Sequence, residues 1–153
     1  MRYRVRGLAP DQFAPLFDLP DAALRSRAIA RVLVERKPDA PCRVSLEDAE
    51  PGERVLLLNY LHQPADTAYR QQGPIFVRRD CVAFDGEALG PAMKLRTLSL
   101  RAFDEAGMML DADLVDGANA EPLIQRLFAN PDAAYIHAHY AKRGCFAARI
   151  DRA

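Results

Sequence analysis

The hydrophobic and polar positions of this chain alternate in short runs, a pattern that favours β-strands over long helices. Most runs alternate at every second residue or are rich in β-branched residues. One run is apolar on both faces, which is expected of a central strand. The strands predicted before residue 80 are 3–8, 28–35, 54–62 (the run that is apolar on both faces) and 74–79.

Helical signals are fewer and shorter. Pro followed by Asp, a pair suited to a first helical turn, opens the segments 10–17 and 20–27, which predicts two short N-terminal helices. A third helix is predicted near 119–130, where an apolar, periodic segment ends at Asn130 and Pro131.

Two hairpins are predicted in the C-terminal half, each around a loop that contains glycine. In the first, the loop Glu105–Gly107 sets Leu100 opposite Ala112 and Arg101 opposite Asp111, so that apolar residues share one face. A slip of one residue would set Leu100 against an aspartate, which a buried face disfavours.

The second hairpin, 135–150, turns at Lys142–Gly144 and contains two of the three histidines. Its apolar face is formed by Ile136, Ala138 and Tyr140, paired with Ile150, Ala148 and Phe146. Its polar face is formed by His137, His139 and Cys145, with Arg149 across from His137. Because burial of the apolar face removes more hydrocarbon from water, the histidines are expected to point outward.

These elements together predict one α+β domain over residues 1–153. Its largely antiparallel β-sheet is accompanied by the short N-terminal helices and by one helix near 119–130.

Composition excludes several classes of partner. Lys plus Arg and Asp plus Glu number 21 each, so no excess positive charge attracts nucleic acid. The longest aliphatic run, 55–58, is far too short to span a membrane. The cysteines Cys42, Cys81 and Cys145 are odd in number and widely spaced, and the N-terminus lacks the apolar segment of a signal peptide. We therefore expect a cytoplasmic protein with three free thiols.

Four blocks carry a family resemblance: "PCRVSLEDAEPGERVLLLNYLHQ", "GPIFV", "SLRAFDEAGMMLDADLVDG" and "GCFAARIDR". They resemble the bacterial family called domain of unknown function twelve-oh-three, over nearly the whole chain. The resemblance implies a free-standing, single-domain bacterial protein. It implies no activity, cofactor or catalytic residue.

The histidines suggest a metal site. His137 and His139 are two residues apart, which places both imidazoles on one face of a strand. A catalytic zinc ion takes three protein ligands and a water molecule, and the third ligand would be His62 or Cys145. The alternative is a partly exposed sheet face without metal. Zinc is the only cofactor that the pattern suggests.

Cys145 and His139 form a second candidate site. They lie diagonally across the second hairpin, and the cationic residues before Cys145 would lower its thiol pKa, as a nucleophilic cysteine requires. The alternative is a cysteine that acts as a small apolar residue. Candidate ligand-binding residues are Arg149, Cys42, Arg43, and, in the long loop after residue 62, Tyr69 and Arg70.

The sequence thus favours a small-molecule or metal-binding pocket, catalytic or not, on the face that carries His137, His139 and Cys145. The alternative is a non-catalytic interaction protein whose histidine face forms a homodimer or a partner interface. Neither substrate nor reaction follows from these residues.

Overall fold

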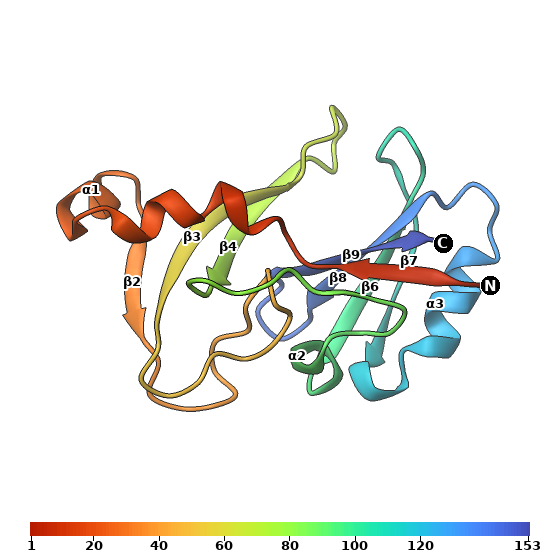
Figure 1. Ribbon diagram of the computed structural model, residues 1–153. Coiled ribbons are helices and arrows are strands. Elements are labelled where there is room, and N and C mark those ends of the chain that lie inside the picture. The colour runs from red at the N-terminus through yellow and green to blue at the C-terminus, as the bar shows by residue number, and fades with distance from the viewer.

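Two antiparallel sheets make up most of the structure, which is a computed structural model that describes residues 1–153 (Figure 1). The strands are β1 (Tyr3–Arg6), β2 (Ala30–Leu33), β3 (Arg54–Gln63), β4 (Gln71–Val77), β5 (Asp85–Gly86), β6 (Thr97–Phe103), β7 (Met109–Asp116), β8 (Tyr135–Tyr140) and β9 (Phe146–Arg152). The larger sheet has the order β5-β1-β9-β8-β6-β7, and the smaller has the order β2-β3-β4. The α+β prediction is confirmed.

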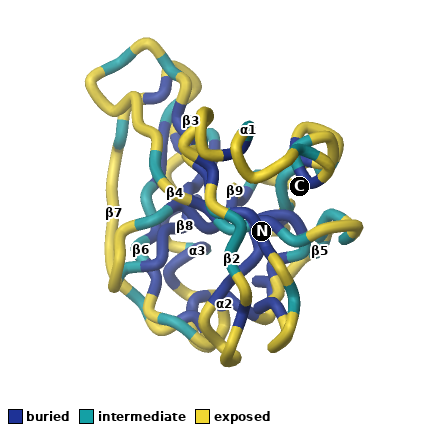
Figure 2. The backbone as a smooth tube through the Cα atoms, turned by 90° about the vertical axis from the view of Figure 1, so that its left-hand side faces the viewer, coloured by how far each residue is buried: buried dark blue, intermediate teal, exposed yellow.

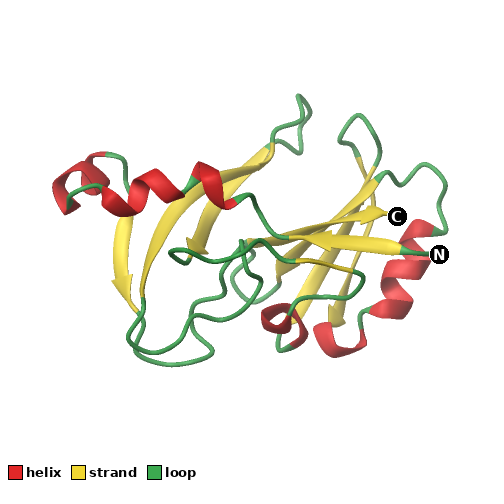
Figure 3. Cartoon of the chain, in the orientation of Figure 1, coloured by secondary structure: helices red, strands yellow, loops and turns green.

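The helices are short and lie outside the sheets (Figure 3). The α-helices are α1 (Asp21–Ser26), α2 (Pro91–Lys94) and α3 (Glu121–Phe128), and the 3₁₀ helices are η1 (Pro10–Gln12), η2 (Ala14–Asp18) and η3 (Gly117–Asn119). The segment 10–17, predicted as one helix, forms two 3₁₀ helices. No helix is long and apolar enough to cross a membrane.

Each sheet has its own apolar core. The larger sheet packs one face against α3, whose buried side chains are Leu123, Ile124, Leu127 and Phe128. The smaller sheet packs against the N-terminal helices, and its core contains Phe13, Phe17, Leu24, Cys42, Val44, Leu56 and Ile75. Cys42 is therefore part of a packed core and not of an open loop.

The first hairpin forms, but its predicted register is wrong by one residue. Leu100 pairs with Asp113, and Arg101 pairs with Ala112. A bulge between Ala102 and Phe103 shifts the pairing next to the turn.

The slip is tolerated because β7 is an edge strand with most of its residues exposed (Figure 2). Asp111 and Asp113 lie on the side that faces α3, where Arg126 binds their carboxylates at 3.1 and 3.0 Å. Leu114, which the sequence pattern assigned to the buried face, is 63% exposed. A cation on the neighbouring helix thus compensates for aspartates that a fully buried face would exclude.

The second hairpin has the predicted pairs Ile136–Ile150, Ala138–Ala148 and His137–Arg149. A bulge after Ala138 then pairs His139 with Phe146, so the predicted Tyr140–Phe146 pair is wrong.

The two histidines of β8 share one side of the strand, as alternation requires, but they do not point outward. His137 is 3% exposed and His139 is 1% exposed. The end of β3 covers them, because His62 packs its ring against both. Strand alternation predicts a shared side, whereas the packing of a second sheet onto that side is a tertiary contact that alternation does not encode.

Candidate functional site

The three histidines of the chain meet between the two sheets. The ring of His62 lies 5.0 Å from that of His139 and 6.1 Å from that of His137, measured between ring centroids. Phe146 stacks on His62 at 5.1 Å with an interplanar angle of 7°. The sequence prediction that these imidazoles belong together is consistent with this arrangement, which we call the histidine cluster (His62, His137 and His139).

The hydrogen bonds of the cluster are incomplete. His139 donates from Nδ1 to the carbonyl oxygen of Gly144 at 2.9 Å, and His62 donates from Nε2 to Oε1 of Gln71 at 3.1 Å. The Nδ1 atoms of His62 and His137 are buried and have no partner within the chain. Two polar atoms thus lie in the interior without compensation.

Burial keeps the imidazoles neutral. It lowers the pKa of His137 to about 3, with the nearby His139 and His62 as lesser causes. It also lowers the pKa of His139 to about 4, although the bond to the Gly144 carbonyl acts in the opposite direction. The pKa of His62 is lowered by burial as well. At neutral pH none of the three rings carries a proton on both nitrogens.

Neutral imidazoles are the form that binds zinc, but the ligand geometry is absent. Three imidazoles that share one tetrahedral zinc ion have ring centroids about 5 Å apart. Only the pair of His62 and His139 has this separation, and His137 lies 6.5 Å from His139. No three His, Cys, Asp or Glu side chains are placed so that they could hold a metal ion. Zinc binding stays a prediction without a preformed site.

Cys145 does not join the cluster. Its Sγ lies 3.9 Å from the carbonyl oxygen of Arg143, and it forms no hydrogen bond with His139, whose Nδ1 is bonded to Gly144. The nucleophile and the base of the predicted Cys–His site are therefore not in contact.

The candidate arginines and the tyrosine have separate positions. Arg149 lies over the ring of Tyr135, at 3.9 Å from its centroid, and donates to Asp151 at 2.7 Å. Tyr69 and Arg70 are exposed in the loop between β3 and β4, and Arg70 bonds a carbonyl of that same loop. These three residues do not surround a common cavity with the histidines.

Arg43 is a buried cation without a carboxylate. It donates from Nε to the carbonyl oxygen of Phe146 at 2.7 Å, and its guanidinium lies 4.9 Å from the centroid of the Tyr140 ring. Burial lowers its pKa. Since it ties the first residue of β9 to the loop that carries Cys42, its role is to connect the two cores.

Cys81, which the sequence does not mark as a site residue, lies next to Cys42. Their Sγ atoms are 3.8 Å apart, and both thiols are free, as is Cys145. Sγ of Cys42 is fully buried and accepts hydrogen bonds from the backbone N–H groups of Val44, Ser45 and Arg78 at 3.3, 3.5 and 3.3 Å. We call these two residues the cysteine pair.

The two thiols of the cysteine pair have pKa values that are shifted in opposite directions. The hydrogen bond from Cys81, followed by the backbone donors, lowers the pKa of the Cys42 thiol to about 5. The same hydrogen bond, together with burial, raises the pKa of Cys81. The three backbone N–H groups on its sulfur favour Cys42 as the thiolate of the pair, with Cys81 as the thiol that donates to it.

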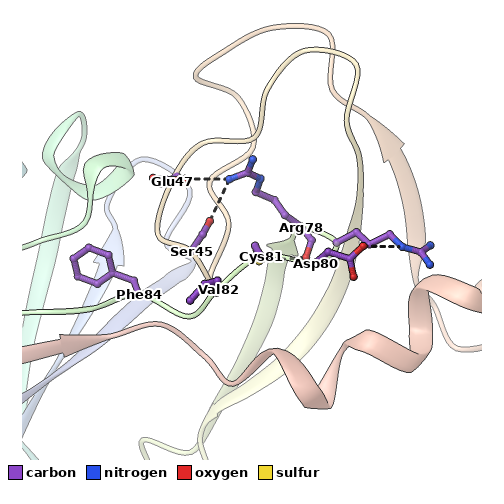
Figure 4. A pocket seen from close by; sticks show the side chains of 8 residues that line it. Ser45, Glu47, Arg78, Asp80, Cys81, Val82 and Phe84 are labelled. Atoms are coloured by element: carbon purple, nitrogen blue, oxygen red, sulfur yellow. Dashed lines mark hydrogen bonds and ion pairs between the residues drawn. The ribbon is translucent and has the colours of Figure 1, made fainter.

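A pocket of about 400 Å³ opens onto Cys81 (Figure 4). Its charged lining residues are Glu47, Arg78, Arg79 and Asp80. The volume is within the roughly 300–1,000 Å³ of small-molecule sites. Asp80 has a φ of +53°, in the left-handed region that reverses the chain and that Asp tolerates better than most residues. The turn after β4 thereby brings Cys81 back to Cys42.

No motif of closely spaced cysteines could reveal this pair, because its members are 39 positions apart in the sequence. The contact depends on a parallel bridge between Cys42 and Phe76 in β4 and on the turn that follows that strand.

Comparison with known proteins adds a family. The family model described as Protein of unknown function (DUF1203) matches residues 39–152. The chain belongs to this family. The matched region contains all three cysteines and all three histidines. No curated protein and no solved structure matches the chain.

Proposed function

We propose that the protein carries out thiol–disulfide exchange with a small molecule, with Cys42 and Cys81 as its redox pair. The observation that supports this proposal is the position of the Cys42 sulfur, 3.8 Å from Sγ of Cys81 and bonded to three backbone N–H groups. A thiolate, and not a thiol, is the nucleophile in disulfide exchange.

Little movement separates the reduced pair from a disulfide. To form a disulfide, the two sulfur atoms must approach from 3.8 Å to about 2.05 Å. The N–H donors stabilise the thiolate of the reduced form more than a neutral disulfide, so the disulfide of this pair is easier to reduce than one without such donors. That property suits exchange and does not suit a permanent structural cross-link.

The location of the protein and the class of its partner are part of this proposal. A bacterial, cytoplasmic location is supported by the family resemblance and by the free thiols, and a small-molecule partner is supported by the pocket at Cys81. The balanced charge disfavours nucleic acid. A homodimer formed through the histidine face is not proposed further, because His137 and His139 are buried within the chain.

The test is a redox equilibrium. The protein is incubated in buffers with increasing ratios of oxidised to reduced glutathione, its remaining thiols are alkylated, and peptide mapping by mass spectrometry locates any disulfide. We expect the number of free thiols to fall from three to one per chain, with a link between the peptides of Cys42 and Cys81. In Cys145→Ser it should fall from two to zero. Three free thiols in the most oxidising buffer, or a link that involves Cys145, would contradict the proposal.

A further inference from the structure

Only one sulfur of the cysteine pair can meet a molecule that enters the pocket. Cys81 lines the pocket (Figure 4), whereas Cys42 is fully buried and is not among the residues that line it. An external disulfide must therefore react first at Cys81, although Cys42 carries the charge. The proton of Cys81 is available to Cys42 through their hydrogen bond.

The exchange takes place in two steps. As the Cys81 proton passes to the Cys42 thiolate, Sγ of Cys81 attacks an external disulfide RSSR, which forms a Cys81–S–S–R bond and releases RS⁻. The released RS⁻ takes the proton from Cys42. The Cys42 thiolate then attacks Sγ of Cys81, which forms the Cys42–Cys81 disulfide and releases a second RS⁻. Two protein sulfurs are oxidised, and RSSR is reduced to one RSH and one RS⁻.

The pocket presents both signs of charge beside Cys81. Arg79 and Asp80 directly precede it in the chain, and their side chains are 51% and 89% exposed. Arg79 contacts Asp18 at 2.6 Å and Asp80 at 3.6 Å. Exposed ion pairs of this kind contribute little net stability, so charges of a ligand can replace them at small cost.

Arg78, the other cation of the pocket, is not available in the same way. Its side chain is mostly buried and binds Glu53 at 3.0 Å and Glu47 at 3.2 Å. It holds the loop that donates to the Cys42 sulfur. Ligand selection is therefore assigned to Arg79 and Asp80.

We infer that the oxidant is the disulfide of a small zwitterionic thiol, of the amino-acid or short-peptide type, with its carboxylate at Arg79 and its ammonium group at Asp80. This inference rests on the proposed redox function. The pocket volume of about 400 Å³ accommodates a molecule of that size.

The experiment compares four disulfides with the Cys145→Ser protein at pH 7. Cystine is zwitterionic, dithiodipropionate has only carboxylates, cystamine has only ammonium groups, and bis(hydroxyethyl) disulfide is neutral. Each oxidation rate is divided by the rate of the same disulfide with free dithiothreitol, which removes intrinsic reactivity. We expect the normalised rate of cystine to exceed that of the neutral disulfide by about tenfold and to exceed the rates of the two disulfides whose charges have one sign.

Two variants assign the charges. Asp80→Asn keeps the size and the tolerance for a left-handed φ, and it should lower the normalised rate of cystine to that of dithiodipropionate. Arg79→Gln should lower the rate of cystine to that of cystamine. Normalised rates within about twofold of one another for all four disulfides, or a maximum for a disulfide whose charges have one sign, would overturn the inference and leave the redox pair intact. If the general thiol oxidant diamide also fails to join Cys42 to Cys81, the proposed function itself is wrong.

Discussion

The cysteine pair and the histidine cluster both bring together residues from distant segments of the chain, and both contain buried groups. Only the cysteine pair has partners that stabilise a charged, reactive form. The Cys42 sulfur is fully buried, but three N–H groups and the Cys81 thiol bond to it, so its charged form is stable. His62 and His137 are also buried, but their Nδ1 atoms have no partner, so their charged forms are suppressed.

The difference shows that burial alone does not make a reactive group. Burial penalises charge at both places, and the partner atoms decide whether a charged form survives. The cysteine pair and the histidine cluster also differ in their access to small molecules. A pocket reaches Cys81, whereas the rings of the histidine cluster pack against one another and against Phe146. We therefore interpret the histidine cluster as packing between the sheets.

The largest expected effect is a loss of stability in mild acid. The unfolded chain binds imidazole protons below about pH 6.5, whereas the folded protein binds them only near pH 3 at His137 and pH 4 at His139. The unfolded state thus takes up more protons as the pH falls through this window, and the free energy of unfolding falls with it. We expect these two residues together to remove roughly 4 kcal/mol between pH 7 and pH 5, as measured by urea denaturation.

His137→Phe is the variant that isolates this effect. Phe keeps the aromatic packing against Phe103 and Phe146 and removes the buried, unpaired nitrogen. The change in unfolding free energy between pH 7 and pH 5 should be smaller than in the wild type by about 2 kcal/mol. An unchanged difference would mean that His137 is protonated in the folded protein, and the contrast with Cys42 would then fail.

A smaller loss is expected at the turn between β6 and β7. Gly107 has a φ of +86°, and a Cβ there would lie 2.3 Å from that of Ala65 and 3.6 Å from the hydroxyl of Tyr135. Gly144 has a φ of +81° and open space around it. Gly107→Ala should lower the unfolding free energy by about 2 kcal/mol and Gly144→Ala by about 1 kcal/mol, because only the first combines strain with a clash. Equal losses in denaturant titrations would show that the contact with Ala65 is unimportant.

The smallest effect is expected at Cys145. Its Sγ has no hydrogen bond to His139 and lies on a partly exposed turn. Cys145→Ser should therefore change the unfolding free energy by less than about 0.5 kcal/mol and leave the Cys42–Cys81 equilibrium unaltered. A shift of that redox equilibrium would return Cys145 to the candidate site.

Much of the fold was predictable from local pattern. The second hairpin was placed correctly at Ile136–Ile150 and Ala138–Ala148, because one of its faces is entirely apolar, which sets the register of the pairs. The first hairpin was misplaced because β7 is an edge strand, where Arg126 of the neighbouring helix α3 makes Asp113 acceptable opposite Leu100. The sequence pattern predicted no element between residues 80 and 94, where β5 and α2 lie.

The candidate site was predictable only in part. The shared side of His137 and His139 follows from strand alternation, but their burial depends on the second sheet, which alternation does not report. Cys42 was named as a candidate ligand-binding residue, whereas Cys81 was not, since their contact depends on the turn after β4 and on the bridge between Cys42 and that strand. The local sequence around each cysteine does not indicate that a turn will bring the two sulfur atoms together.

The most direct test of the difference between the cysteine pair and the histidine cluster is a pH titration that follows the ultraviolet absorbance of thiolate. The hydrogen bonds at Cys42 predict one thiolate per chain that forms with a midpoint near pH 5, while the protein is still folded. The signal should persist in Cys145→Ser and disappear in Cys42→Ser. If no thiolate absorbs below about pH 8, the ordinary range of a free cysteine, Cys42 is a neutral core residue and the account of the cysteine pair is wrong.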